Sequence, residues 1–156
     1  MKLITPQCEK IIRDWLIYPG SFVERLKKHG VHYPRIRVLY QGWQYPSPLE
    51  RKRLNIPART CAFIREVSIG NENKTFMFAR TVFPKTVLRG KWRCFQHLKN
   101  KTLGSILFKN HFKRSQFEIL KTKETWMRRS IFSREENQLL LTEYFLKDVF
   151  KLCAQK

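Results

Sequence analysis

The stretch LLLTEYFL, residues 139–146, places one carboxylate, that of Glu143, inside an apolar run. In a β-strand, alternate side chains point to the same face of the sheet. The face that carries Glu143 also carries Leu139, Leu141 and Phe145. Burying a carboxylate costs several kcal/mol unless an opposite charge or hydrogen-bond donors compensate it. The stretch therefore predicts a core strand whose single carboxylate needs a partner from elsewhere in the chain.

Two further predicted strands repeat this pattern with an arginine. In TCAFIREVSI (60–69), Arg65 is in phase with apolar residues, and in KTFMFARTVF (74–83), Arg80 is in phase with two phenylalanines and a valine. One explanation is that these rows face outward, or that the three charges form a structural ion network. The other is a pocket with hydrocarbon walls, two guanidiniums and a carboxyl. Such a pocket suits a small aromatic or alicyclic carboxylate, because arginine binds carboxylates through paired hydrogen bonds and apolar walls hold a ring.

The rest of the chain predicts an α+β domain that spans residues 1–156. Apolar spacing predicts a helix over 7–17, and the Ser21–Glu24 capping box predicts a second helix over 21–30. The proline-rich segment 44–59 is predicted to be a surface loop, and Thr102 is expected to cap a short helix. Further strands are predicted at 35–43, 115–121, 125–132 and 138–146. Successive hairpins favour a single antiparallel β-sheet with helices packed on it.

The charge of the chain is unusually positive. It contains 32 Lys and Arg against 12 Asp and Glu, a net charge of +20. A nucleic-acid binder has this kind of charge, but a field that attracts a small anionic substrate, or a lysine-rich proteome, explains it equally well. The basic residues are spread along the chain, which weakens the nucleic-acid interpretation. The segment KWRCFQHLKNK (91–101) remains its best candidate surface, because aromatic and basic residues alternate there.

Other classes of protein are disfavoured by simpler features. The four cysteines, Cys8, Cys61, Cys94 and Cys153, lie far apart and form no C-x-x-C pair, so neither a zinc site nor a disulfide framework is expected. No segment approaches the roughly 18 apolar residues of a membrane span, and residues 1–20 lack the apolar core of a signal peptide. We therefore expect a monomeric cytoplasmic protein with no metal and no membrane span.

Seven segments, in order, resemble the chorismate lyase (chorismate pyruvate-lyase) family. They are DWLIYPGSFVERL (14–26), IREV (64–67), ARTVFP (79–84), LGSILF (103–108), FEI (117–119), RRS (128–130) and LLLTEYFL (139–146). The resemblance implies one antiparallel sheet with flap helices over an internal site. It also implies a cofactor-independent lyase that eliminates pyruvate from chorismate to give 4-hydroxybenzoate for ubiquinone biosynthesis.

The same resemblance assigns roles to particular residues. Arg65 looks like the residue that grips the ring carboxylate, and Glu143 looks like the partner of the 4-hydroxyl. Backbone groups of Phe22 and Leu103 look like further carboxylate contacts, and Arg80 is similar to an arginine of the family and is expected to help clamp the anion. Arg65 and Glu143 are thus the predicted catalytic pair.

Two alternatives to an enzyme stay open at this point. A non-catalytic sensor with the same fold, such as the effector domain of a transcription regulator, would bind a small aromatic carboxylate without releasing pyruvate. A basic nucleic-acid-binding module would bind oligonucleotides in a salt-sensitive manner and ignore chorismate. The chain also departs from the family, since Ser115 stands where an aspartate commonly follows the arginine.

Overall fold

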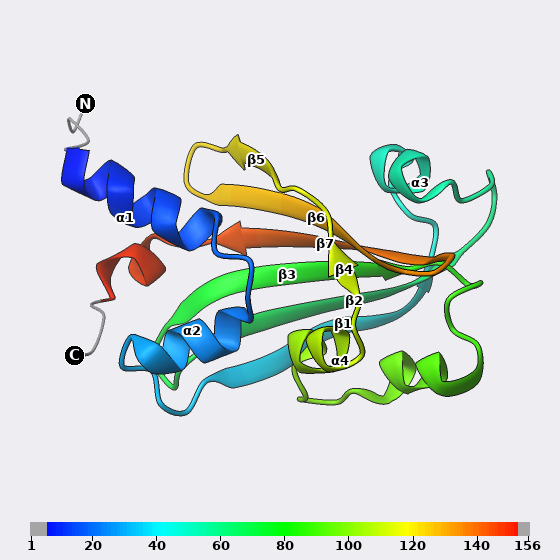
Figure 1. The fold of residues 1–156 in the computed structure, drawn as a ribbon, viewed down its shortest axis with the longest axis horizontal. Coiled ribbons are helices and arrows are strands. Elements are labelled where there is room, and N and C mark those ends of the chain that lie inside the picture. The colour runs from blue at the N-terminus through cyan, green and yellow to red at the C-terminus, as the bar shows by residue number, and fades with distance from the viewer. Residues whose placement is uncertain (1–5, 153–156) are drawn as a thin grey trace.

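One antiparallel sheet forms the framework of the protein. The computed structural model describes residues 6–152, and its strands follow the order β1-β2-β3-β7-β6-β4, with β5 also paired to β6 (Figure 1). The strands are β1 (Arg35–Gln44), β2 (Ala62–Gly70), β3 (Thr75–Phe83), β4 (Lys113–Arg114), β5 (Glu118–Lys121), β6 (Trp126–Arg134) and β7 (Asn137–Phe145). Every pairing is antiparallel. The predicted α+β class with a single antiparallel sheet is therefore confirmed.

Several of the short helices begin directly after residues whose side chains cap them. The helices are α1 (Pro6–Leu16), α2 (Phe22–Lys28), α3 (Pro48–Leu54) and α4 (Leu103–Lys109), with 3₁₀ helices η1 (Gly90–His97) and η2 (Lys147–Lys151). Ser21 caps α2 and Thr102 caps α4, each accepting a hydrogen bond from the third residue of its helix. Both capped helices agree with the sequence predictions.

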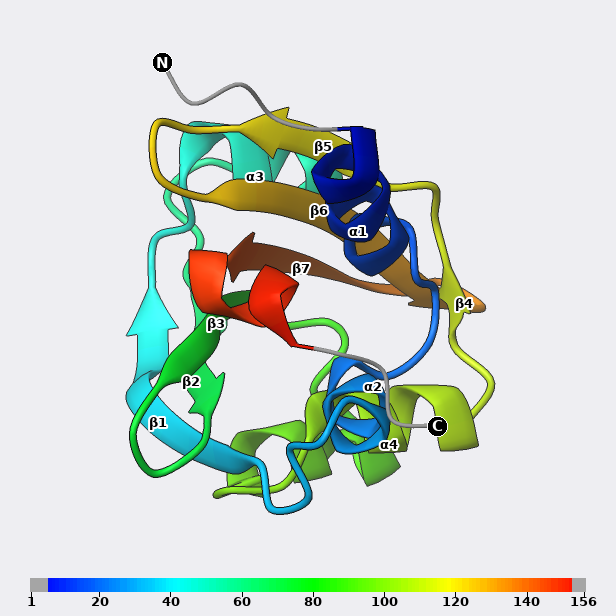
Figure 2. The same cartoon turned by 90° about the vertical axis from the view of Figure 1, so that its left-hand side faces the viewer.

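The sheet is curved, and its two faces are covered differently. Figure 2 shows α1, α2 and α4 on the inner side of the curve and α3 behind the sheet. Two apolar clusters fill the inner face, centred on Phe145 near α1 and α2 and on Phe95 near η1 and α4. A third, smaller cluster lies under α3 on the outer face and includes Ile64 and Leu140.

The segment predicted as a loop, 44–59, contains a helix, so that prediction is wrong. Ser47 and Glu50 form a reciprocal capping box, and Pro48 occupies the first turn of α3, where its missing N–H is harmless. Asn55 ends the helix in the left-handed conformation (φ 52°). The number of prolines suggested a loop, but their positions fit a helix start.

Two strand predictions also need correction. The predicted strand 115–121 is divided, since its first residues follow β4 and only the second half forms β5. In β1 the pairing register shifts between Val38 and Tyr40, so the predicted alternation fails there. Ile36 consequently lies against the inner-face cluster and Tyr40 against the outer one. A bulge of this kind is common in an edge strand, where it discourages pairing with another sheet.

Candidate active site

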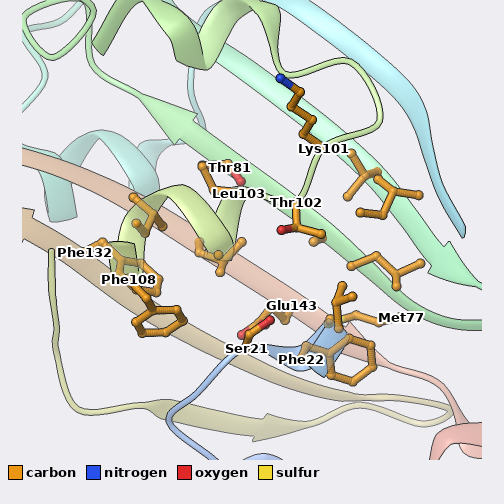
Figure 3. Close-up of a pocket in the computed structure, with 18 of the residues that line it drawn as sticks. Ser21, Phe22, Met77, Thr81, Lys101, Thr102, Leu103, Phe108, Phe132 and Glu143 are labelled. Carbon is orange, nitrogen blue, oxygen red and sulfur yellow. The ribbon is translucent and has the colours of Figure 1, made fainter. Parts of the chain in front are cut away.

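A cavity lies between the inner face of the sheet and the helices α2 and α4 (Figure 3). The empty space in the cavity and at its opening to solvent amounts to about 600 Å³. Strand residues form its apolar floor, among them Val67, Met77, Ala79 and Leu141. Mainly apolar walls with a few polar groups are typical of sites for small organic ligands.

Arg65 lies in this cavity as a buried cation. It is 3% exposed, and its Nη2 donates to the carbonyl oxygens of Lys99 (2.9 Å) and Lys101 (3.1 Å). Its Nε is buried without a hydrogen-bond partner, and no Asp or Glu of residues 6–152 forms a salt bridge with it. Burial lowers the pKa of Arg65 to about 10. A desolvated guanidinium without an anion is a ready site for a carboxylate.

Glu143 is buried in the same cavity and receives three hydrogen bonds. Its Oε2 accepts from Arg128 Nε (2.5 Å) and Arg114 Nη2 (2.9 Å), and its Oε1 accepts from Arg128 Nη2 (3.1 Å). A carboxylate oxygen has two lone pairs for hydrogen bonding. These contacts occupy both lone pairs of Oε2 and one of Oε1, so Oε1 retains the capacity to accept from a ligand hydroxyl.

Arg128 connects Glu143 to the first helix. It is 1% exposed, and its Nη1 donates to the carbonyl oxygens of Leu16 (3.0 Å) and Tyr18 (2.8 Å) at the end of α1. Its neighbour Arg129 points to the opposite face and donates to Glu118 (3.0 Å). Adjacent residues of a strand point to opposite faces, so only Arg128 of this pair serves the cavity side.

Arg65 and Glu143 lie toward different ends of the cavity. They are on β2 and β7, which are separated by β3. Ala79 of β3 pairs with both Glu143 and Val67, so Glu143 is two residues away from Arg65 along the strand direction. With strands about 4.8 Å apart and about 3.4 Å per residue, their Cα atoms are about 12 Å apart. In Figure 3, Glu143 lies beside Ser21, while Thr81, the cross-strand neighbour of Arg65, lies further along. A para-substituted ring between them would meet a cation at one end and a carboxylate at the other.

The two backbone positions singled out by the sequence, Phe22 and Leu103, both line the cavity. Each is the first residue of a short helix, Phe22 of α2 and Leu103 of α4. The N–H groups of a first helical turn have no partner within the helix. Both residues thus bring backbone donors to the rim of the cavity.

Arg80 does not belong to the cavity, and the expectation that it helps to clamp the anion is wrong. It lies on the outer face, where Nε and Nη2 donate to the two oxygens of Glu50 (2.9 Å each) and Nη1 donates to Glu66 (2.6 Å). Hydrogen bonds to Glu50 raise its pKa above the usual value, although burial opposes this. For Arg80, the explanation that it faces outward was correct, and its ion-pair partners are Glu50 and Glu66 rather than Glu143.

The phase of β3 explains this error. Both rows of the strand are rich in apolar residues, so alternation alone does not tell which row faces inward. The structure places Met77, Ala79 and Thr81 in the cavity wall, which turns Phe78, Arg80 and Val82 outward. In β2 and β7 one row is clearly more apolar, and there the predicted phase is right.

Arg114 is a cavity residue that was missed in the sequence. It lies in the two-residue strand β4 and contacts Glu143 and the backbone of Pro19, both far away in the chain. Arg128 could have been found, because Arg128 and Glu143 are equidistant from the turn between β6 and β7 and are therefore cross-strand partners. For Arg114 the sequence offers a weaker signal, because it is the arginine that precedes Ser115, where the family commonly has an aspartate.

The basic segment 91–101 does not offer stacking surfaces for bases. Trp92 and Phe95 are buried in the inner-face cluster, where their rings stack on each other. Within residues 6–152 there is no group of three His, Cys, Asp or Glu residues that could hold a metal ion. None of the helices in this range is long and apolar enough to cross a membrane.

Comparisons with known proteins agree with this geometry. A family profile described as chorismate lyase matches residues 5–154. A probable chorismate pyruvate-lyase of Marinobacter nauticus is 33% identical, covering 96% of this chain and 83% of that protein. A chorismate pyruvate-lyase of Pectobacterium atrosepticum is 30% identical, covering 88% and 77%.

A solved structure of low sequence identity has a similar fold. The effector domain of PhnF from Mycobacterium smegmatis superposes with a TM-score of 0.60 at 8% identity, covering 83% of this chain and 90% of that domain. At this identity the likeness concerns the fold alone. The family profile and the relatives together establish that the chain belongs to the chorismate lyase family.

Proposed function

We propose that the protein eliminates pyruvate from chorismate and leaves 4-hydroxybenzoate, the aromatic acid that enters ubiquinone biosynthesis. The observation that carries the proposal is the unpaired cation of Arg65 in a cavity whose other end holds Glu143. Membership of the chorismate lyase family supports the same reaction. In this proposal the protein uses no metal and no organic cofactor.

The ring carboxylate binds at Arg65. The buried Nε and the remaining N–H groups of the guanidinium donate to it, and the backbone N–H of Leu103 lies close by, because Arg65 already bonds the carbonyl of Lys101 two residues earlier. The N–H of Phe22 adds a donor from α2. Charge-assisted hydrogen bonds of this kind are roughly twice as strong as neutral ones.

The 4-hydroxyl binds at Glu143. Two arginines donate to this carboxylate, and its Oε1 keeps one acceptor position for the hydroxyl hydrogen. In this arrangement Glu143 acts as an acceptor that orients the ring. It does not need to remove the hydrogen from C4.

The chemistry is intrinsic to the substrate once it is held in place. The bond between C3 and the ether oxygen breaks, the hydrogen of C4 moves to the enolpyruvyl methylene, and the ether oxygen becomes the keto oxygen of pyruvate. The ring becomes aromatic, and no oxidant or reductant is needed. The protein contributes by fixing the reactive pose and by placing buried positive charge near the departing oxygen.

Incubation of the purified protein with chorismate, with a chelator present, tests the proposal. We expect equal amounts of pyruvate and 4-hydroxybenzoate. Arg65→Met should lower kcat/KM at least tenfold, about 1.4 kcal/mol in the barrier. Arg129→Met removes the same charge from the outer face and should retain activity.

Two results would contradict the proposal. Tight binding of chorismate without release of pyruvate would identify a sensor. Salt-sensitive binding of oligonucleotides with no response to chorismate would identify a nucleic-acid-binding module.

A further inference from the structure

The Glu143 end of the cavity carries more positive charge than its carboxylate neutralises. Both Arg114 and Arg128 contact Glu143, and all three side chains are at most 8% exposed. No other Asp or Glu of the described chain forms a salt bridge with either arginine. One buried positive charge at this end therefore lacks an anion, in addition to that of Arg65 at the other end. The buried charged side chains in the cavity wall and directly behind it, Arg65, Arg114, Arg128 and Glu143, have an excess of two positive charges, which matches a dianion. Lys101, which also lines the cavity, is exposed to solvent.

The two arginines differ in their access to the cavity. Arg128 lies behind Glu143, outside the cavity wall. Its guanidinium donates hydrogen bonds to Glu143 and to the carbonyl groups at the end of α1. Arg114 forms part of the cavity wall. Only Arg114 can meet a ligand directly.

Arg114 also retains donors for such a ligand. Its Nε donates to Ser130 Oγ (2.9 Å), its Nη1 to the carbonyl oxygen of Pro19 (3.2 Å) and its Nη2 to Glu143 Oε2 (2.9 Å). A guanidinium has five N–H groups. These contacts use three of them, so one N–H on each Nη atom is available.

The environment of Arg114 favours a second anion. Burial lowers its pKa to about 10, and the nearby charge of Arg128 acts in the same direction, although Glu143 opposes both. The rings of Phe117 and Phe132 lie against its guanidinium, with distances of 4.5 and 4.8 Å from Cζ to the ring centroids. These contacts hold the side chain in place and exclude water from it.

The connectivity of chorismate places its second carboxylate at this end. The ring carboxylate is on C1 and the hydroxyl is on C4, at the opposite end of the ring. The enolpyruvyl ether is on C3, next to the hydroxyl. If the ring carboxylate is at Arg65 and the hydroxyl at Glu143, the enolpyruvyl carboxylate must lie near Glu143.

On the basis of the function proposed above, we propose that Arg114 binds the enolpyruvyl carboxylate. Arg65 and Arg114 then each hold one carboxylate, and Glu143 holds the hydroxyl between them. The site consequently selects dianions over aromatic monoanions. After elimination, the second carboxylate leaves as pyruvate, and the remaining monoanion has no carboxylate for the two available N–H groups of Arg114.

A pair of ligands that cannot react tests this inference without turnover. The dianion 3-(carboxymethoxy)-4-hydroxybenzoate carries a carboxylate on an ether next to the hydroxyl, and 4-hydroxybenzoate lacks it. We expect the wild-type protein to bind the dianion roughly tenfold to a hundredfold more tightly, as for a hydrogen-bonded charged group. Titration calorimetry at constant ionic strength gives both affinities.

Substitutions then assign the preference to one side chain. Arg114→Met should abolish the preference for the dianion, and Arg114→Lys should retain part of it. Arg129→Met, which removes one charge from the outer face, should leave it unchanged. Equal affinities of the two ligands in the wild-type protein would overturn the inference, even if Arg114→Met does not fold. An unchanged preference in folded Arg114→Met would overturn it as well.

The test of the Arg114 subsite can fail or succeed independently of the test of the proposed function. If the wild-type protein converts chorismate but Arg114→Met keeps the preference, the function stands and the Arg114 subsite is refuted. If no pyruvate forms but the preference depends on Arg114, the subsite stands and the catalytic function is refuted.

Discussion

Replacing Glu143 with Gln is expected to destabilise the protein strongly. The substitution keeps the size of the side chain but removes the charge between Arg114 and Arg128. These side chains are 4%, 8% and 1% exposed, so water cannot compensate for the loss. Removing one partner of a buried ion pair costs about 3–5 kcal/mol, because the remaining charge stays buried without compensation. We expect a loss of this size for Glu143→Gln.

Urea unfolding monitored by tryptophan fluorescence measures this loss. The matched control is Glu118→Gln, since Glu118 also bridges two arginines, Arg53 and Arg129, but its side chain is 42% exposed. Exposed ion pairs contribute about 0–1 kcal/mol, so the control should stay close to the wild type. The reasoning would be refuted if Glu143→Gln lost less than about 1 kcal/mol or no more than the control.

Three other expectations follow from the charges of the molecule. Arg65→Met should weaken 4-hydroxybenzoate binding at least roughly tenfold in calorimetric titration, yet lower the unfolding free energy less than Glu143→Gln, because no carboxylate loses its partner. Benzoate binding should weaken as the pH rises above about 10, where free Arg65 loses its proton, and constant affinity through that range would contradict this. Burial tends to raise the pKa of Glu50, but hydrogen bonds from Arg80 and Ser47 outweigh it and hold the pKa below 4.5. The stability due to Glu50 is therefore complete above pH 4.5 and lost below it, so the urea midpoint of Glu50→Gln should depend less on acid pH.

The sequence predicted the inward face of two strands because each has one predominantly apolar row. In β2 and β7 that row contains a single charged residue, Arg65 or Glu143, and the structure places both in one cavity. The same argument failed for Arg80, because both rows of β3 consist mainly of apolar residues. On the outer face of β3, Val82 is also buried, in the apolar cluster under α3. The alternation of side chains assigns a charged residue to the inner or outer face only where the two rows of a strand differ in polarity.

The partners of Glu143 show how far a sequence can go. Arg128 is its cross-strand neighbour in a hairpin with a short turn, so the pairing follows from counting residues on both sides of that turn. Arg114 reaches the same carboxylate from a two-residue strand after α4, and it also bonds Pro19, 95 positions earlier. Such long-range contacts depend on the packing of the whole domain and leave no local pattern. The α3 helix, by contrast, had a local signal in its Ser-Pro-x-Glu start.

A crystal structure with 4-hydroxybenzoate tests the central claim most directly. The account predicts the ligand in the cavity, with its carboxylate on the guanidinium of Arg65 and its hydroxyl within hydrogen-bond distance of Glu143 Oε1. A ligand bound in the reverse orientation, or outside this cavity with Arg65 still bonded only to backbone carbonyls, would contradict it.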